Sequence, residues 1–377
     1  MNLIEMVDLK RQYAKIKSEI DAKMAAVIHE AAFIQGAMVK TFQQHLEEWL
    51  SVKHVIPCGN GTDALQIALM AAGLQPGDEV ITVPFTFFAT AEVIALLGLQ
   101  PVFVDVEKDS FNMDVSQLEA AITPKTRAII PVHLFGQCCD MENIMHIADK
   151  HHLFVIEDSC QAMGAQIIFR DGTKKHAGTI GHIGCTSFFP SKNLGCYGDG
   201  GALFTNDTQL AERAWAIANH GASVKYHHEL IGINSRLDSL QAAVLDVKLN
   251  YLKAYTAARQ QAAAFYDKAF MDLANIIIPA KMSYSTHVYH QYTIQLKGID
   301  RPKLIEELKN RGIPSMIYYP IPLHQQKALQ NKITGNNSFP VAETLCKSVL
   351  SLPMHTELDE EQLECVVQGV ARGAGDL

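Results

Sequence analysis

Short apolar runs alternate with amphipathic segments from about residue 54 to residue 220, and this alternation constrains the fold more than any other feature. The runs are apolar throughout, as are strands that a sheet buries on both faces. Such a pattern predicts an α/β layered domain with a mostly parallel sheet, whose ligand lies at the carboxyl ends of the strands. The expected strands span residues 54–58, 79–83, 101–106, 128–135, 153–158, 185–189 and 201–205.

The pattern changes after residue 219, where a long helix is expected over 238–270. A strand is expected over 287–296, and helices over 301–312, 340–350 and 359–371. A chain of 377 residues is long for one hydrophobic core. We therefore expect a large α/β domain with an N-terminal helical segment over residues 1–250, and a smaller α+β domain over 251–377.

Composition excludes several classes of partner. A formal net charge of −8 argues against nucleic acid or an anionic membrane. Neither a signal-peptide core nor an apolar run of membrane-spanning length occurs. The eight cysteines form no CxxC pair, which favours a reduced, cytoplasmic protein. The sixteen histidines show no metal-binding spacing, so no metal site is expected.

The segment CGNGTDALQIAL, residues 58–69, predicts a strand, a glycine turn and a helix. Thr62 or Asp63 is expected to cap this helix. The backbone N–H groups at such a helix start bind phosphate, assisted by the helix dipole. Turns of this kind are common, so this motif alone does not establish an anion site.

The segment VIEDSCQAMGA, residues 155–165, predicts a strand that ends at two carboxylates, with Gln161 just beyond. Asp158 either caps the next turn or serves as a functional acid at the edge of the sheet. The functional reading requires a cationic partner, because an unpaired buried carboxylate would become protonated.

The segment SFFPSKNLGCYGDGGA, residues 187–202, places a single lysine, Lys192, in a glycine-rich loop between two strands. A dinucleotide site is disfavoured, because the glycines do not follow GxGxxG and no helix comes after them. Lys192 is either solvated or held among strand ends, where burial would lower its pKa and free the amine as a nucleophile. Together the three motifs supply a phosphate cradle, an acid for a ring nitrogen and an imine-forming lysine, as pyridoxal 5′-phosphate (PLP) requires.

The chain also resembles a known family over nearly its whole length. Collinear segments carry the resemblance: GTDAL, PFTFFATAE, PVHLFGQ, EDSCQAMGA, TSFFPSKNLGCYGDGGA, NHG, GINSRLDSLQAA, YYPIPLH and LSLPMH. They resemble the DegT/StrS-type sugar-nucleotide aminotransferases, which are fold-type-I PLP enzymes. Within that family the chain is most similar to the WbpE-type enzymes. These aminate UDP-2-acetamido-2-deoxy-3-oxoglucuronate at C3 with glutamate, in the synthesis of diamino sugars for surface polysaccharide.

The resemblance assigns roles to the residues of the three motifs. Lys192 would form the imine with the cofactor and carry the proton during transamination. Asp158 would keep the ring nitrogen protonated, and Gln161 would lie near the 3-hydroxyl. The expected phosphate contacts are Gly61, Thr62 and Ser187, and Phe87 is expected to stack on the ring.

The resemblance also implies a homodimer with shared active sites. Asn234 would reach the phosphate from the neighbouring subunit, and Arg236 would meet a carboxylate of the donor or the sugar. Tyr319 and His324 would line the pocket of the keto-sugar nucleotide, while glutamate would leave as 2-oxoglutarate. Tyr318 stands where related sequences often carry histidine, and residues 167–184 form a longer insertion, expected to be a surface hairpin.

Alternative functions stay open at this point. The substrate could be a dTDP-, GDP- or UDP-linked oxo-deoxysugar aminated at C3 or C4. A PLP-dependent sugar dehydratase on the same fold is disfavoured, because such relatives replace the imine lysine with histidine and this chain keeps Lys192. A non-catalytic regulator on the same scaffold is the alternative from another class.

Overall fold

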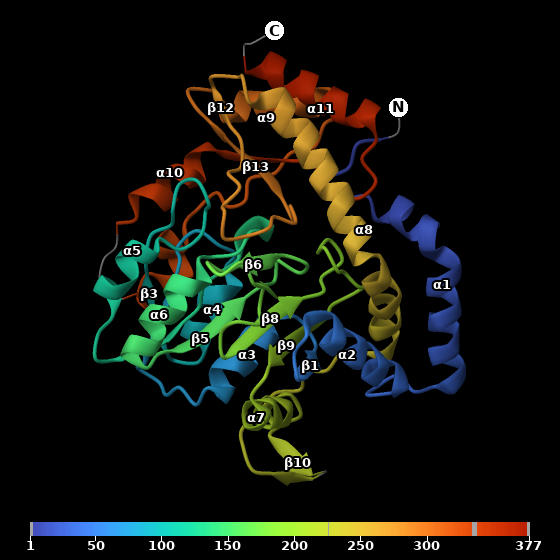
Figure 1. Ribbon diagram of the computed structural model, residues 1–377, viewed down its shortest axis with the longest axis vertical. Coiled ribbons are helices and arrows are strands. Elements are labelled where there is room, and N and C mark those ends of the chain that lie inside the picture. The colour runs from blue at the N-terminus through green and yellow to red at the C-terminus, as the bar shows by residue number, and fades with distance from the viewer. Residues whose placement is uncertain (1–2, 225, 334–337, 375–377) are drawn as a thin grey trace.

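The computed structural model describes residues 3–224, 226–333 and 338–374. A seven-stranded sheet forms the centre of the larger part (Figure 1). Only β9 runs antiparallel to both of its neighbours, so the sheet is mixed but mostly parallel, as the alternation predicted. In spatial order its strands are β1 (His54–Cys58), β9 (Gly201–Thr205), β8 (Ile183–Ser187), β5 (Phe154–Asp158), β4 (Thr126–Ile129), β2 (Glu79–Thr82) and β3 (Gln100–Phe103).

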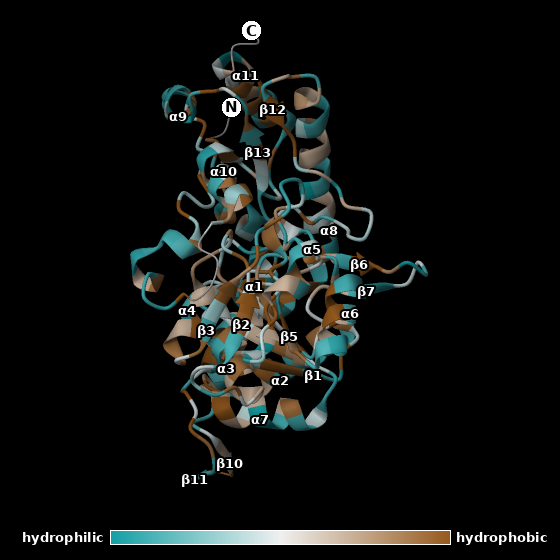
Figure 2. Cartoon of the chain, turned by 90° about the vertical axis from the view of Figure 1, so that its left-hand side faces the viewer, coloured by the Kyte–Doolittle hydropathy of each residue, from teal (hydrophilic) through white to brown (hydrophobic). Residues whose placement is uncertain are grey.

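Helices cover both faces of this sheet, and this explains why its strands are apolar throughout. Ile81 packs on the face covered by α6, whereas its neighbour Val80 packs on the opposite face, beneath α3 and α7. Hydrophobic residues accordingly gather along the central strands (Figure 2). The surrounding helices are α2 (Ala37–Leu50), α3 (Gly61–Ala71), α4 (Ala89–Leu96), α5 (Val115–Leu118), α6 (Met141–His151) and α7 (Thr208–Ala218).

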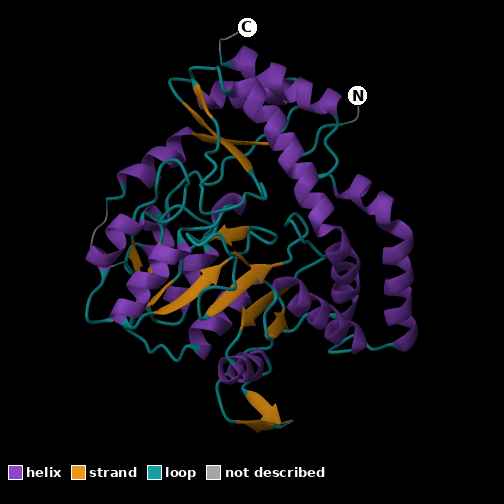
Figure 3. Ribbon diagram, in the orientation of Figure 1, coloured by secondary structure: helices purple, strands orange, loops and turns teal. Residues whose placement is uncertain are grey.

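The long helix α8 (Ser239–Phe270) connects the larger part to a smaller α+β part (Figure 3). Its first half packs against α1 (Leu9–Glu30) and α2, and its last turns reach the core of the smaller part. The expected domain boundary after residue 250 falls within α8, so the division there stays a prediction. The smaller part contains β12 (Ile276–Ile277), β13 (Tyr292–Leu296), β14 (Val349–Leu352), α9 (Arg301–Asn310), α10 (Pro340–Ser348) and α11 (Glu360–Gly373).

Several expected strands end or begin inside their apolar runs. The strand expected over 101–106 ends at Phe103, the one expected over 185–189 lies two residues earlier, at Ile183–Ser187, and two further runs differ more. In the run over 128–135 the regular strand ends at Ile129, an isolated parallel bridge still joins Val132 to Asp158 of β5, and the run closes in a 3-10 turn, Leu134–Gly136. Pro131 offers no N–H to a ladder, and Phe135 has a positive φ of 55°, which no strand accommodates. The run over 287–296 becomes a strand only at Tyr292, because Tyr289 has a φ of 47°.

Two hairpins project from the sheet. In the insertion 167–184, β6 (Gln166–Ile168) pairs antiparallel with β7 (Lys174–His176), which confirms the expected hairpin. A second hairpin, β10 (Ala222–Val224) with β11 (His227–His228), extends away from the body at the bottom of Figure 1. Among the helices of the described residues, none combines the length and the apolar character that crossing a membrane requires.

Candidate active site

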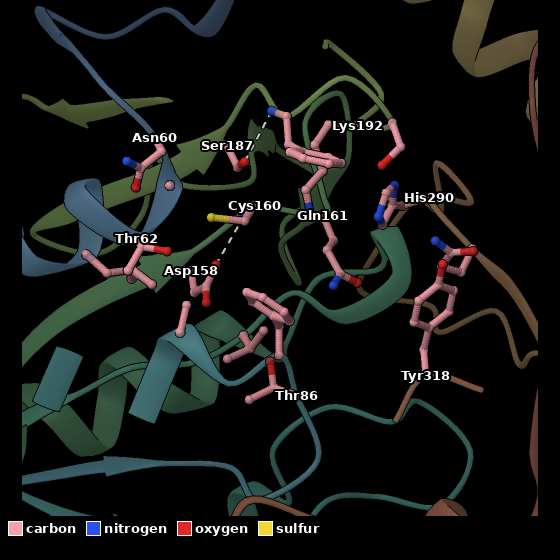
Figure 4. A pocket seen from close by; sticks show the side chains of 18 of the residues that line it. Asn60, Thr62, Thr86, Asp158, Cys160, Gln161, Ser187, Lys192, His290 and Tyr318 are labelled. Atoms are coloured by element: carbon pink, nitrogen blue, oxygen red, sulfur yellow. Dashed lines mark hydrogen bonds between the residues drawn. The ribbon is translucent and has the colours of Figure 1, made fainter. Parts of the chain in front are cut away.

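A cavity of about 670 Å³ opens where β5 and β8 end and α3 begins (Figure 4). This is the edge of the sheet at which the sequence predicts a ligand. The three motifs, far apart in the chain, all contribute to its wall. The predicted residues that line it are Gly61, Thr62, Phe87, Asp158, Gln161, Ser187, Lys192 and Tyr319.

The start of α3 forms one end of the cavity. Asn60 caps this helix by accepting a 2.8 Å hydrogen bond from the Asp63 N–H, so the expected cap at Thr62 or Asp63 was wrong. The N–H groups of Gly61 and Thr62 belong to the first helical turn, which offers them no intrahelical acceptor. Both residues line the cavity, and the helix dipole adds positive potential there. This end of the cavity is therefore suited to a phosphate group.

Gly61 is where α3 approaches the end of β8 most closely. A Cβ atom at this position would lie 2.7 Å from the Ser187 Cβ and 3.0 Å from the Cys160 Sγ. Contacts below 3.0 Å essentially never occur, so only glycine brings the helix start this near to Ser187. The sequence predicted Gly61 and Ser187 as joint phosphate contacts, and the structure places them side by side.

Asp158 ends β5 and is almost fully buried, with 5% of its surface exposed. Its Oδ2 accepts a 2.8 Å hydrogen bond from the Thr90 hydroxyl, and its Oδ1 accepts one of 3.2 Å from the Cys160 N–H. These two bonds fix the orientation of the carboxylate at the cavity wall. Thr90 lies within the PFTFFATAE segment, but nothing in its local sequence indicated this contact.

Gln161 holds two further walls of the cavity together. Its Oε1 accepts a 2.9 Å hydrogen bond from the Phe135 N–H, and its Nε2 donates one of 3.0 Å to the Tyr319 hydroxyl. The Phe87 ring, 56% exposed, lies with its centroid 6.2 Å from that of Tyr319. Phe87 and Tyr319, with Tyr318 beside them, thus form an aromatic side of the cavity.

Lys192 lines the cavity and is half-buried rather than freely exposed to solvent. Burial lowers the pKa of its amine below the ordinary value, and the negative charge of Asp158 only partly opposes this. Burial also raises the pKa of the neighbouring Cys160 thiol, which therefore stays protonated. A lysine with a lowered pKa has more neutral amine, the form that attacks a carbonyl carbon.

The glycines of the Lys192 loop serve its close packing against other parts of the chain. A Cβ at Gly195 would lie 2.4 Å from the Pro190 carbonyl oxygen, and one at Gly201 would lie 2.4 Å from that of Asn60. The loop is also held from α8, where the buried Lys248 Nζ donates a 2.8 Å hydrogen bond to the Gly195 carbonyl. The loop that carries Lys192 is therefore closely packed on several sides.

Three predicted residues lie outside this cavity. Asn234 is exposed and Arg236 half-buried, on the segment whose Ser235 donates a 2.7 Å hydrogen bond to Asp63. His324 is buried against Phe339, and its Nε2 lies 3.1 Å from a Glu343 carboxylate oxygen. The structure thus places Asn234 and Arg236 near the start of α3 without bringing them into the cavity of their own chain.

The cavity residues fit the cofactor that the sequence implies. The start of α3 suits the phosphate, Asp158 suits a protonated ring nitrogen, and Lys192 is a buried amine. Phe87 offers an exposed ring that a planar cofactor could cover. Within the described residues, no group of three histidine, cysteine or carboxylate side chains is arranged to hold a metal ion.

Comparison with known proteins supports the same assignment. Residues 14–371 match the model of the DegT/DnrJ/EryC1/StrS aminotransferase family. The chain is 46% identical to the "Pleiotropic regulatory protein" of Geobacillus stearothermophilus, with 98% of each chain covered. It is 45% identical to the UDP-2-acetamido-2-deoxy-3-oxo-D-glucuronate aminotransferase of Pseudomonas aeruginosa, with 97% of this chain and 98% of that protein covered. It is 44% identical to the UDP-N-acetyl-3-dehydro-alpha-D-glucosamine 3-aminotransferase of Acidithiobacillus ferrooxidans, with 98% and 97% covered.

Solved structures agree with these relatives. A DegT/DnrJ/EryC1/StrS aminotransferase from Brucella abortus superimposes with a TM-score of 0.94 at 42% identity, covering 99% of this chain and 100% of that one. S. venezuelae DesV, in complex with a ketimine intermediate, superimposes with a TM-score of 0.95 at 36% identity, covering 100% of both chains. NtdA from Bacillus subtilis, with its bound cofactor PMP, superimposes with a TM-score of 0.88 at 30% identity, covering 98% of this chain and 83% of that one. The chain therefore belongs to the DegT/DnrJ/EryC1/StrS aminotransferase family and is a PLP-dependent transaminase.

Proposed function

We propose that this enzyme transfers the amino group of glutamate to C3 of a keto-sugar nucleotide, UDP-2-acetamido-2-deoxy-3-oxoglucuronate or a close analogue. The observation that carries the PLP-dependent transaminase assignment is the convergence of Lys192, Asp158 and the start of α3 on one cavity. The choice of a UDP-linked 3-oxo sugar is supported by the two relatives at 45% and 44% identity, both of which act at such a carbon by name. The product would serve the synthesis of surface polysaccharide.

Lys192 is proposed to perform the proton transfers. The bound cofactor supplies an electron sink that makes the Cα–H of the amino donor acidic. Lys192 then takes the proton from that carbon and returns one during the second half of the reaction. Its lowered pKa suits both tasks, because a larger fraction of the amine is neutral and able to accept a proton that it later gives up.

Asp158 and Gln161 are proposed to hold the cofactor ring. The Asp158 carboxylate would pair with the protonated ring nitrogen, and its bonds to Thr90 and to the Cys160 N–H orient it for that contact. Gln161 would approach the 3-hydroxyl, while its bonds to Phe135 and Tyr319 keep the amide from rotating. The start of α3, with Ser187 beside it, would bind the phosphate.

The proposed assembly is a cytoplasmic homodimer in which each cavity is completed by the neighbouring subunit. Asn234 is exposed, and neither it nor Arg236 lines the cavity of its own chain. Both remain available to contact the phosphate or a substrate carboxylate in a second subunit. All eight cysteines are free, in keeping with a reducing compartment.

A regulatory protein on this scaffold is a second candidate, because a relative at 46% identity is described as a pleiotropic regulatory protein. The intact set of Lys192, Asp158 and Gln161 in one cavity favours the enzyme. The absorbance of the purified protein separates the two candidates. An enzyme becomes coloured when PLP is added, and a regulator with a decayed site does not.

The substrate assignment is tested by a transamination screen with glutamate against 3-oxo and 4-oxo sugar nucleotides. The panel carries UDP, dTDP and GDP, each with and without a C6 carboxylate. We expect the highest kcat/KM on a UDP-linked 3-oxo sugar, with 2-oxoglutarate formed in equal amount. Activity on a 4-oxo deoxysugar alone would refute the C3 assignment but keep the transaminase.

A further inference from the structure

His290 is a cavity residue that neither the sequence motifs nor the proposed mechanism uses. It lines the same cavity as Lys192, and Figure 4 shows its ring entering that space. The residue is only 5% exposed, and its Nδ1 is buried without a hydrogen-bond partner among the described residues. A buried ring nitrogen without a partner costs stability, so its position at the site calls for an explanation.

The backbone beside His290 is fixed by a buried arginine. Arg259 of α8 is 3% exposed, and its Nη1 donates to the carbonyl oxygens of Tyr289, His290 and Met354 at 3.0, 3.4 and 2.9 Å. On the other side, a Cβ atom at Gly136 would lie 2.9 Å from the backbone nitrogen of His290, so Gly136 packs closely against this backbone. The imidazole is therefore presented to the cavity from a rigid support.

The same segment is joined directly to the Lys192 loop. Asn193, the residue after Lys192, donates a 3.1 Å hydrogen bond from its Nδ2 to the Val288 carbonyl oxygen. Asn193 is itself buried, so this bond lies away from solvent. The bond holds the segment that carries His290 at a fixed position relative to the loop that carries Lys192.

The charges around His290 keep its ring neutral. Burial holds the pKa of His290 well below its ordinary value, and the positive charges of Lys192 and Arg259 lower it further. A neutral imidazole keeps one ring nitrogen as a hydrogen-bond acceptor. Lys192 lines the same cavity, and its amine carries N–H groups that can donate a hydrogen bond to such an acceptor.

We propose that His290 positions Lys192: its neutral imidazole accepts a hydrogen bond from the Lys192 amine whenever that amine is not joined to the cofactor. The inference rests on the proposed role of Lys192, because only a lysine that is released and recaptured needs such a support. His290 would keep the free amine inside the cavity between its two proton transfers.

The first test measures the pKa of Lys192 in cofactor-free protein. Lysines are labelled with a trace of acetic anhydride across a pH series, and the Lys192 peptide is quantified by mass spectrometry. In His290→Leu the lost acceptor destabilises the ammonium form, so the labelling midpoint should move to lower pH by about one unit. A merely structural role would admit water and move the midpoint upward, toward that of an ordinary lysine.

Two further variants control this experiment. His290→Asn keeps a side-chain acceptor and should restore most of the wild-type midpoint. His287→Phe alters a buried histidine of the same segment that does not line the cavity, and it should leave the midpoint in place. An upward shift or no shift in His290→Leu, or no restoration by His290→Asn, would overturn the proposal.

The second test uses the PLP-loaded enzyme with the sugar nucleotide identified by the screen. His290→Leu should lower kcat about tenfold while the KM values stay within about twofold, because positioning of Lys192 affects the proton transfers rather than binding. An unchanged kcat would overturn the positioning role. The labelling experiment needs no activity, so failure of the proposed reaction and failure of this contact are distinguishable.

Discussion

The side-chain amide of Gln161 donates a 3.0 Å hydrogen bond to the hydroxyl of Tyr319. Gln161 follows strand β5, whereas Tyr319 lies 158 residues later, in the segment YYPIPLH. Because Gln161 also accepts a bond from the Phe135 N–H, a single amide joins three walls of the cavity. The bond thus couples the predicted cofactor side of the cavity to its predicted sugar side.

Tyr319→Phe should lower kcat/KM about tenfold, because it leaves the Gln161 amide without its acceptor at a cost of about 1–2 kcal/mol. The test is a double-mutant cycle with Gln161→Ala, measured as kcat/KM for the sugar nucleotide. We expect the double variant to lose little more than Gln161→Ala alone, since Gln161→Ala has already removed the bond to Tyr319. Fully additive losses would show that the two side chains act independently.

Gly61→Ala should weaken PLP binding and destabilise the fold by about 1–3 kcal/mol, because the new Cβ would meet Ser187 and Cys160. Chemical denaturation and PLP titration measure the two effects. The matched control is Gly61→Ala combined with Ser187→Gly, which removes the nearest colliding atom. This pair should recover part of the lost stability, and a wild-type affinity in the single variant would contradict the close approach.

Lys192→Ala should reduce turnover by at least about 10²–10⁴-fold, the usual contribution of a positioned acid–base group. The variant should keep its thermal unfolding temperature, since a buried amine is removed from a cavity wall and not from the core. Lys253→Ala, which removes an exposed lysine on α8, serves as the control for loss of charge. Wild-type turnover in Lys192→Ala would disprove the proposed mechanism.

The alternation of apolar runs was sufficient to predict the central sheet. β1 and β9 have the predicted bounds, because turn residues close each run at both ends. The run over 128–135 continues past its strand and the run over 287–296 begins before its strand, because the remaining residues of both runs are buried in segments that are not regular strands. An apolar pattern reports burial, and it does not distinguish a strand from a buried irregular segment.

Some of the cavity residues could be predicted from the sequence, and others could not. Gly61, Asp158 and Lys192 sit in motifs whose local pattern already implies a turn, a strand end and a loop. The sequence predicted the helix cap at Thr62 or Asp63 instead of Asn60, because the stretch GNGTD offers several residue types that cap helices equally well. His290 could not be predicted, because its position depends on Arg259, which lies 31 residues away on α8.

Lys248 should make the stability of the protein depend on pH in a recognisable way. Burial lowers the pKa of this lysine to about 8. Above that pH the unfolded chain still binds a proton that the folded chain has released, so stability rises with pH, by at most about 1.4 kcal/mol per pH unit. Denaturation of wild type and Lys248→Met between about pH 7 and pH 10 isolates this contribution.

The Lys248→Met variant also loses the bond to the Gly195 carbonyl, which adds a constant difference at every pH. Only the slope is diagnostic. The wild type should gain stability relative to the variant as the pH rises from about 8 to about 10. If the free energies of unfolding of the wild type and the variant changed in parallel with pH, Lys248 would titrate normally in the folded protein.

Asn234 should act on the cavity of the neighbouring subunit, because it is exposed and lies outside its own. Asn234→Ala and Lys192→Ala should each be impaired alone. Mixed after reversible dissociation, they should recover about a quarter of wild-type activity, since about half of the dimers are mixed and each holds one intact site. Two samples of Lys192→Ala mixed together are the control. If Asn234 served its own chain, the mixture would show no more activity than the average of the two separate variants.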